Sequence, residues 1–507
     1  MILYHLVMNG NLVSSPYPVE IEKFLSARYG SSLIIKGSPG AGKTTLALQI
    51  LENLSNKYKV IYFSTRVGDE SLYQQFPWLR NLEKNIKMLI ASKLFLEEIT
   101  KKVQVEEKPI KDYGKKLLQE MTGEKTPQVY RSMLNFYFKD TSSPEIKKLY
   151  DDVETNLPKK SLIVVDSVEG ITSKYGISEQ NFVYMLQKDI VEGANASIIF
   201  ISEKENLGPE DYVVDGVIYQ RHNIDEGKRI RIITLNKLRG IEIGQSSFAY
   251  TLENGRFRVF YPENYYYENM KFVESKNVGN RYKTGIEDFD GLLGGGLYPG
   301  SFFTLEIDKE ISQDELKLFL RPIGLNFLLN NIGILMIPPG GWSVEKLKQD
   351  LTRFIPLELF EEKLRYIDYL TQESKSKYLV AAGGTDYDAI NQRLFRAMLD
   401  LTGIENKPIL HFIGMDTLEY VKGTESAIKE IFNMSQAIKS SNDVGISAVR
   451  TGQILKDEII NISDYYVKLV SINNVPFIYG IKPRTIYYAL EVDLQKGFPN
   501  IKLSPMV

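Results

Sequence analysis

The residues with the clearest chemistry lie in one glycine-rich segment, residues 37–44, whose spacing is that of a phosphate-binding loop. The segment is Gly-Ser-Pro-Gly-Ala-Gly-Lys-Thr and fits G-x-x-x-x-G-K-[ST] at every fixed position. Its glycines allow backbone N–H groups to turn around a polyphosphate. Lys43 would reach the β- and γ-phosphates, and the Thr44 hydroxyl would bind Mg²⁺. We therefore predict a nucleoside triphosphate site made by Gly37, Ser38, Pro39, Gly40, Ala41, Gly42, Lys43, Thr44 and Thr45.

Such a loop works between a strand and a helix, and its flanking residues predict both. The apolar run 33–35 precedes it, and residues 45–51 predict a helix whose N-terminus adds partial positive charge. Further short apolar runs alternate with helical stretches, at residues 60–64, 88–90, 162–165 and 197–201. Strands alternating with helices predict an α/β fold with a mostly parallel sheet covered on both faces.

Asp166 ends one of these apolar runs and is the second candidate ligand of the metal. In P-loop enzymes a carboxylate positions Mg²⁺ opposite the hydroxyl ligand of the loop. The alternative is a helix-capping or turn aspartate. The upstream loop favours the first interpretation, with Thr44 and Asp166 as the metal-binding pair.

Composition limits the other functions open to the chain. At 507 residues we expect two or three domains, and a net charge of −2 argues against a surface built for nucleic acid. The absence of cysteine excludes disulfides and thiolate metal sites and fits a cytoplasmic protein. No apolar run is long enough for a transmembrane helix, and the first residues do not have the pattern of a signal peptide, so we expect no membrane association.

Two features describe the organisation of the chain. Residues 93–160 are rich in Lys and Glu with apolar residues at helical spacing, which predicts a helical insertion serving as a lid or spacer. The second half weakly repeats the first, in the same order: residues 86–90, 161–167 and 211–218 have echoes at 364–367, 409–417 and 462–469. We therefore predict a duplicated fold, with domains at 1–270 and 271–507.

The chain resembles the KaiC-like branch of the RecA/RadA ATPases in the phosphate loop and in three further motifs, at 164–167, 214–218 and 236–240. Residues 62–67 and 72–78 are closer to the archaeal gas-vesicle regulator GvpD and its relatives. Residues 284–296 resemble the segment that precedes the phosphate loop in KaiC-like domains. The resemblance implies two tandem RecA-like domains, ATP with Mg²⁺ as the ligand, and self-association, often as a ring.

The resemblance also assigns roles to Lys237 and Arg239. In the family a Lys-x-Arg pair reaches the γ-phosphate bound by a neighbouring subunit, where it would neutralise charge on the transferring phosphoryl group. The alternative is two exposed basic residues at a strand end. The predicted catalytic residues are Lys43, Asp166, Glu70, Asp69, Lys237 and Arg239.

The position of the catalytic glutamate departs from the family pattern. RecA-like ATPases place it at the end of the second core strand, where this chain has Arg66 and Val67. Asp69 and Glu70 lie just beyond and would supply the base if their loop folds back. Weaker candidates are Glu169 and Glu203. Because a general base contributes about 10²–10⁴ in rate, we expect hydrolysis to be slow.

The second half does not contain a phosphate loop. After the apolar run 302–305 the chain continues Glu-Ile-Asp-Lys-Glu-Ile-Ser, with no glycine and with three carboxylates that would repel phosphate. We predict a degenerate, nucleotide-free domain. Lys482 and Arg484 occupy the place of Lys237 and Arg239, either to touch ATP held by an intact domain or by chance.

Three functions remain open from the sequence. The first is an ATP-binding regulatory protein that acts as a nucleotide-dependent switch on a protein partner. The second is a recombinase-like, DNA-stimulated ATPase, which would need a basic nucleic-acid face or a DNA-binding module. The third is an autokinase, which would need a competent second nucleotide site.

Overall fold

A computed structural model describes residues 5–8, 11–27, 29–65, 67–91, 129–137, 143–262, 271–404, 406–453, 456–493 and 500–507. The chain divides into two compact units, Met1–Phe260 with Val507 (unit 1) and Tyr261–Met506 (unit 2). The domain boundary between residues 270 and 271 stays a prediction, and residues 263–270 lie outside the described part.

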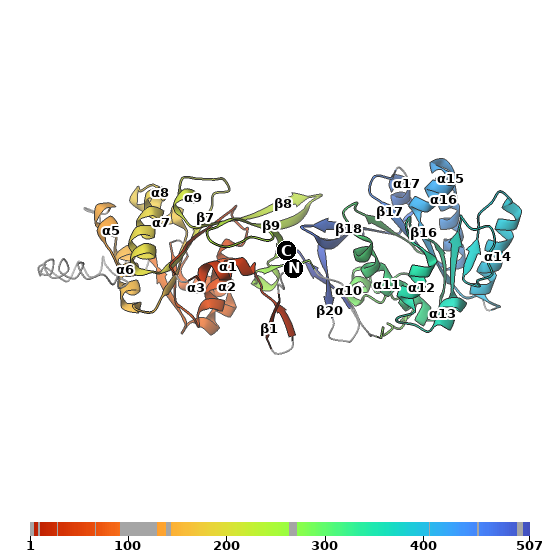
Figure 1. Cartoon of the computed structure of the whole chain (residues 1–507), viewed down its shortest axis with the longest axis horizontal. Coiled ribbons are helices and arrows are strands. Elements are labelled where there is room, and N and C mark those ends of the chain that lie inside the picture. Colours follow the sequence, from red (N-terminus) through yellow and green to blue (C-terminus); the bar gives the residue numbers. More distant parts are fainter. Residues whose placement is uncertain are drawn as a thin grey trace, which may run out of the picture. The chain divides into compact units, whose positions relative to one another are not determined.

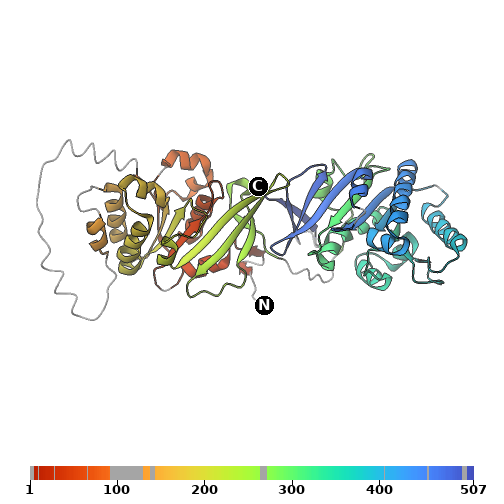
Figure 2. The same ribbon diagram turned by 90° about the horizontal axis from the view of Figure 1, so that it is seen from above.

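The described residues of unit 1 form a nine-stranded sheet in the order β11-β10-β9-β8-β3-β7-β6-β4-β5 (Figures 1 and 2). The strands from β8 to β5 are parallel, and β9, β10 and β11 extend the sheet antiparallel. Their bounds are β3 Ser32–Lys36, β4 Lys59–Ser64, β5 Ile86–Ile90, β6 Ser161–Asp166, β7 Ser197–Ser202, β8 Gly216–Asp225, β9 Lys228–Leu238, β10 Ser247–Thr251 and β11 Arg258–Val259. A separate hairpin joins β1 His5–Met8 to β2 Asn11–Ser14.

Helices cover both faces of this sheet, so its central strands are buried on both sides and are almost continuously apolar. One face carries α1 Val19–Leu25, α2 Lys43–Leu54 and α3 Asp69–Gln75. The other carries α5 Ser132–Tyr137, α6 Pro144–Asn156, α7 Val168–Tyr175, α8 Glu179–Leu186 and the π-helix η2 Gln187–Glu192. Shorter elements are η1 Pro77–Leu82, α9 Glu210–Val213 and η3 Glu253–Gly255.

The predicted insertion, 93–160, contains α5 and α6 in its described part, while residues 92–128 and 138–142 lie outside that part. The Asp189 carboxylate of η2 ties these helices to the core. It accepts hydrogen bonds from the Leu134 N–H and the Tyr150 hydroxyl, each at 3.0 Å. Asp189 thus supplies an acceptor for an N–H group at the start of α5.

Unit 2 has a ten-stranded sheet in its described part, in the order β15-β14-β13-β16-β17-β12-β18-β19-β20-β21. Without the edge strand β15, the strands from β14 to β21 correspond one by one to the strands from β5 to β11 of unit 1. This equal order confirms the predicted tandem RecA-like fold. The bounds are β12 Phe302–Ile307, β13 Gly333–Ile337, β14 Leu364–Asp368, β15 Leu379–Ala381, β16 Ile409–Gly414, β17 Val444–Arg450, β18 Tyr465–Ile472, β19 Val475–Lys482, β20 Tyr488–Asp493 and β21 Asn500–Pro505.

The two faces of the second sheet pack against different helices. Alternate strand residues such as Ile334 and Met336 face α10 Glu287–Leu292, α11 Gln313–Leu329, α12 Val344–Leu351 and α13 Leu357–Lys363. Their neighbours, such as Leu335 and Ile337, face α14 Tyr387–Thr402, α15 Met415–Lys422, α16 Thr424–Ser441 and α17 Lys456–Ile462. This alternation is the period-2 pattern of a strand between two helical layers.

The same polar anchor recurs in both units. In unit 1 the Asp215 carboxylate accepts from the Ser32 N–H at 3.2 Å, and the Asp215 N–H donates to the Ser32 carbonyl at 3.0 Å. In unit 2 Asp464 and Phe302 exchange the corresponding bonds at 2.8 and 2.9 Å. Unit 2 therefore keeps this contact between its strands although it lacks a phosphate loop.

Candidate functional site

The glycine-rich loop lies between β3 and α2, as the sequence predicts, and its glycines adopt positive φ angles. Gly42 is the N-cap of α2, with φ 90°, and no side chain caps that end of the helix. The first N–H groups of a helix need acceptors, and an open N-terminus is a ready anion site. The loop is therefore built to receive phosphate oxygens.

Gly37 is the position in the loop where a side chain is excluded by backbone. A Cβ at Gly37 would lie 1.9 Å from the Gln220 carbonyl oxygen, whereas a Cβ at Gly40 would meet nothing within 4 Å. We expect Gly37→Ala to lower the free energy of unfolding of unit 1 by about 3 kcal/mol. The control Gly40→Ala, with φ 78°, should cost about 1 kcal/mol.

Urea unfolding would measure this difference through Trp78, the tryptophan of unit 1, in a Trp342→Phe background. Equal losses for the two alanine variants would contradict the close approach of β8 to the loop.

Lys43 lies buried at the start of α2, with its ammonium group turned onto its own loop. Its Nζ donates to the Gly37 carbonyl at 2.7 Å and to the Ser38 carbonyl at 2.9 Å. Burial lowers the pKa of Lys43, although the charges of Glu203, Asp166 and other acids act in the opposite direction. Phosphate oxygens would satisfy this cation better than two neutral carbonyls.

Asp166 is brought to the loop by β6, as predicted. Its Oδ2 accepts from the Thr44 hydroxyl at 2.7 Å and from the Tyr62 hydroxyl at 2.6 Å. Burial raises the pKa of Asp166, against the hydrogen bonds from Tyr62 and Thr44 and the charge of Lys43. Hydroxyl and carboxylate oxygens are the ligands Mg²⁺ prefers, and it usually takes one or two side chains plus phosphates. No cluster of three or more acidic or histidine ligands occurs among the residues that the structure describes.

The hairpin of β8 and β9 adds loop contacts that the sequence reasoning missed. His222 Nδ1 lies 3.2 Å from the Ser38 hydroxyl, and Arg231 donates to the Gly40 carbonyl at 3.0 Å. The Tyr250 hydroxyl of β10 donates to the Ala41 carbonyl. Burial lowers the pKa of His222, followed by the charges of Arg231 and Arg229. The one available sequence signal was the alternation of Arg229 and Arg231, which places both on one face of a strand.

The candidate bases are more dispersed. Asp69 and Glu70 begin α3, and Glu70 forms an exposed ion pair with Arg80 at 3.0 Å. Val67 follows β4, and Arg66 lies outside the described residues.

Glu169, in contrast to the exposed Glu70, interacts electrostatically with Lys43 of the loop. Its Oε1 accepts from the Ser202 hydroxyl at 2.6 Å and from the Glu203 N–H at 2.9 Å. Its Oε2 is buried without a hydrogen-bond partner among the described residues. Both Glu169 and Glu203 act electrostatically on Lys43.

Lys237 is the second-last residue of β9 and Arg239 directly follows the strand, beside the first residues of β8. Lys237 Nζ donates to the Val214 carbonyl at 2.6 Å, and Arg239 pairs with Asp215 at 2.7 Å. Because β3 and β8 are parallel and the loop follows the end of β3, this pair lies at the opposite edge of the sheet from the loop. In unit 2, Lys482 makes the corresponding bond, to the Ser463 carbonyl at 3.3 Å.

In the turn that replaces the loop in unit 2, side chains already accept hydrogen bonds from the backbone N–H groups. Ser312 caps α11 through a capping box: its hydroxyl accepts from the Glu315 N–H at 3.2 Å, while Glu315 accepts from the Ser312 N–H at 2.7 Å. Asp308 also accepts from the Glu310 N–H at 3.0 Å. These backbone donors, which a phosphate would need, are already satisfied by the side chains of Asp308, Ser312 and Glu315.

A charged residue near the end of the preceding strand also changes sign between the units. Lys36 of β3 is fully buried and pairs with Glu210 at 2.8 Å and Asp211 at 3.0 Å. Glu306 has the corresponding place in β12, where it accepts from the Tyr466 hydroxyl at 2.8 Å. The strand therefore carries a positive residue next to the loop in unit 1 and a negative one in unit 2.

The fold and loop define a P-loop nucleotide-binding protein with two RecA-like units. Residues 21–123 match the family model described as GvpD gas vesicle protein, P-loop domain. The chain is 23% identical over 512 residues to protein GvpD2 of Halobacterium salinarum, covering 97% of this chain and 96% of that protein. Protein GvpD1 of the same organism is 22% identical over 97% of both chains.

A second group of relatives covers less of the chain. The circadian clock oscillator protein KaiC of Parathermosynechococcus lividus is 23% identical over 290 residues, which are 54% of this chain and 45% of that protein. These likenesses support a P-loop protein similar to the KaiC-like and GvpD-like branch of the RecA superfamily of ATPases. Among the described residues, no helix has the length and apolar character to cross a membrane.

Proposed function

We propose that the protein binds one ATP with Mg²⁺ in unit 1, hydrolyses it slowly, and acts as a nucleotide-dependent switch on a protein partner. The observation that carries this proposal is the contrast between two equivalent helices. In unit 1, α2 begins without a side-chain cap behind a glycine loop, whereas in unit 2, α11 is capped by its own Ser312 and Glu315. One site is open to phosphate, and its counterpart is closed.

Slow hydrolysis is supported by the surroundings of β4. The carboxylate that follows this strand, Glu70, is held by Arg80 and is 71% exposed. Glu169 is close to Lys43 electrostatically, but one of its oxygens is engaged by Ser202 and the Glu203 N–H. Loss of a well-placed base costs about 10²–10⁴ in rate, so a turnover of roughly 10⁻³–10⁻¹ s⁻¹ follows from ordinary enzyme rates.

Self-association is supported by the place of Lys237 and Arg239. They lie at the edge of the sheet opposite the loop, so they cannot reach a nucleotide held by their own unit 1. If they act on a γ-phosphate, that phosphate belongs to another copy of the chain. The proposed switch is therefore an oligomer in which bound ATP changes contacts between copies and with the partner.

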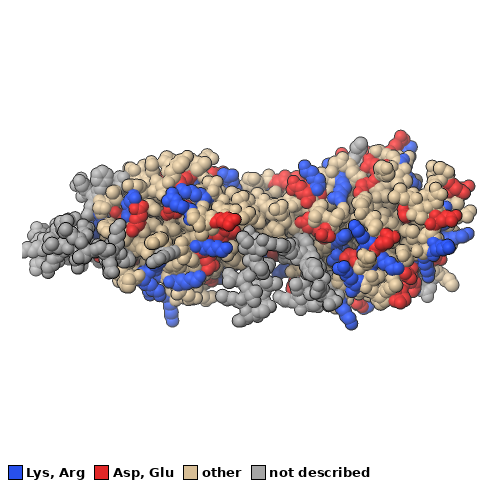
Figure 3. Space-filling view, in the orientation of Figure 1, with Lys and Arg blue, Asp and Glu red and all other residues tan. Residues whose placement is uncertain are grey.

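No observation favours the DNA-stimulated alternative. On the face seen in Figure 3, basic and acidic side chains are interspersed over both units rather than gathered into a basic stripe. A nucleic-acid surface would need clustered Lys and Arg.

Turnover and nucleotide retention test the proposal together. We expect purified protein to retain about one ATP or ADP per chain, and phosphate release to proceed at or below roughly 0.1 s⁻¹ with or without single-stranded DNA. Chromatography of the extracted nucleotide and a coupled phosphate assay measure the two quantities. Many-fold stimulation by DNA, or two nucleotides per chain, would contradict the switch.

A further inference from the structure

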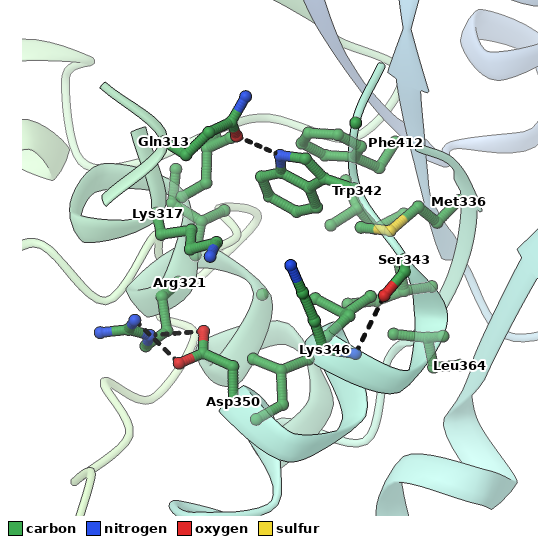
Figure 4. A pocket seen from close by; sticks show the side chains of 18 residues that line it. Gln313, Lys317, Arg321, Met336, Trp342, Ser343, Lys346, Asp350, Leu364 and Phe412 are labelled. Carbon is green, nitrogen blue, oxygen red and sulfur yellow. Dashed lines mark hydrogen bonds and ion pairs between the residues drawn. The ribbon is translucent and has the colours of Figure 1, made fainter. Parts of the chain in front are cut away.

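Unit 2 contains a cavity of about 170 Å³ between α11, α12 and one face of its sheet (Figure 4). Its floor consists of apolar side chains that alternate along β13, β14 and β16: Ile334, Met336, Leu364, Leu410 and Phe412. The same residues belong to the hydrophobic core, so the cavity is a gap in a packed layer. Protein interiors seldom keep voids larger than a water molecule, and an apolar void of about 150 Å³ accepts a benzene ring.

The mouth of the cavity carries a fixed aromatic ring. The Trp342 indole N–H donates to Gln313 Oε1 at 2.7 Å. The indole stacks on Phe412, with ring centroids 6.3 Å apart and an interplanar angle of 18°. These two contacts hold a flat apolar surface at the entrance, as Figure 4 shows. Such a surface suits a ring or a branched aliphatic group.

The same mouth carries excess positive charge. Arg321 is neutralised by a bidentate pair with Asp350, with both hydrogen bonds at 2.9 Å. Among the described residues, Lys317 has one ion pair, a long one of 3.9 Å with the exposed Asp314. Lys346 makes no ion pair within the described part of the chain. Figure 4 shows both lysines extending into the space below Trp342.

We propose that this cavity binds a small organic acid, with an apolar group the size of one aromatic ring inside and an anionic head between Lys317 and Lys346. The cavity runs along the side of α11 and is not lined by the turn at residues 308–312 that replaces the phosphate loop. The cavity meets the start of α11 at Gln313, and its apolar floor does not suit a polyphosphate. The proposal does not depend on nucleotide binding in unit 1.

Fluorescence of Trp342 provides a direct test, because the chain has two tryptophans and Trp78→Phe leaves one. We would titrate the full-length Trp78→Phe protein with 3-phenylpropanoate, 3-phenylpropanamide and propanoate. The phenyl acid should give a saturable change with Kd between about 10 µM and 1 mM. The amide should bind roughly ten-fold more weakly, and propanoate should give no response.

Gly324 offers a way to fill the cavity without a clash. It lines the cavity from α11, and a Cβ placed there meets nothing within 4 Å. Gly324→Leu should abolish the response to both phenyl compounds while the thermal midpoint is kept or raised. Gly291→Leu is the matched control, since Gly291 is an exposed helical glycine with the same free space and does not line the cavity.

A second variant tests the anionic head separately. Lys317→Gln with Lys346→Gln should weaken the acid about ten-fold and leave the amide unchanged. Three results would overturn the proposal: no saturable response to the acid up to 10 mM (~1,000-fold above the lower expected Kd), parent-like binding by Gly324→Leu, or equal affinity for acid and amide in the parent.

Discussion

Replacement of Lys43 by alanine is expected to lower the affinity for ATP by about 10²-fold. Lys43 is buried, and burial lowers its pKa, so the free protein gains little from this cation. Bound phosphates would replace its two carbonyl partners, Gly37 and Ser38, by charged acceptors. Equilibrium titration with a fluorescent ATP analogue measures the loss.

Lys309→Ala is the control for this prediction. Lys309 lies in the turn between β12 and α11, where unit 2 has no phosphate loop. Its removal should leave both affinity and stoichiometry unchanged. A comparable loss in the two variants would mean that unit 2 also binds nucleotide, and that the capped end of α11 opens.

Asp166→Asn is expected to stabilise the nucleotide-free protein and to weaken Mg²⁺-dependent ATP binding by roughly 10–100-fold. The pKa of Asp166 is raised in the folded state, mainly by burial. Its ionised form therefore disfavours folding, and this cost grows as the pH rises from the ordinary carboxyl pKa toward the folded value, then persists at neutral pH. An asparagine oxygen can still accept from Thr44 and Tyr62 without the charge.

Thermal unfolding between pH 4 and pH 8 separates the two effects. Without ligand, the variant should melt a few degrees above the parent at neutral pH, with the difference closing toward acid pH. With ATP and Mg²⁺ the order should reverse, because only the parent gains the full ligand stabilisation. The exposed Asp388→Asn of α14 should change neither curve. A variant less stable than the parent without ligand at neutral pH would contradict the assigned role.

The sequence was enough for the parts of the site that are contiguous or follow a strand. The loop at residues 37–44, the strand ending at Asp166 and the tandem order of strands need only local patterns and the rule that parallel strands alternate with helices. Tyr62, His222 and Arg231 could not be found in this way. They reach the loop or its aspartate because strands distant in sequence pair in one register, which no local pattern specifies.

The cavity of unit 2 was also beyond sequence reasoning. Its lining residues, such as Ile334, Leu410 and Phe412, have the same apolar pattern as residues that pack without a gap. Whether neighbouring side chains fill the space depends on summed volumes and rotamers. The catalytic base stays a prediction, since Asp69 and Glu70 lie on α3 and Arg66 is outside the described residues.

The open start of α2 and the sealed start of α11 make the two halves of the chain differ in what keeps them folded. Unit 2 caps α11 with its own Ser312 and Glu315, so we expect its folding equilibrium to be independent of nucleotide. In unit 1 no side chain caps the N-terminus of α2, so a ligand would have to satisfy its first N–H groups. ATP at 1,000 times its Kd would add about 4 kcal/mol to the stability of unit 1. If unit 1 binds ATP as proposed, cellular ATP would set the lifetime of the protein as well as its state, because a fall in ATP would expose unit 1 to proteases first.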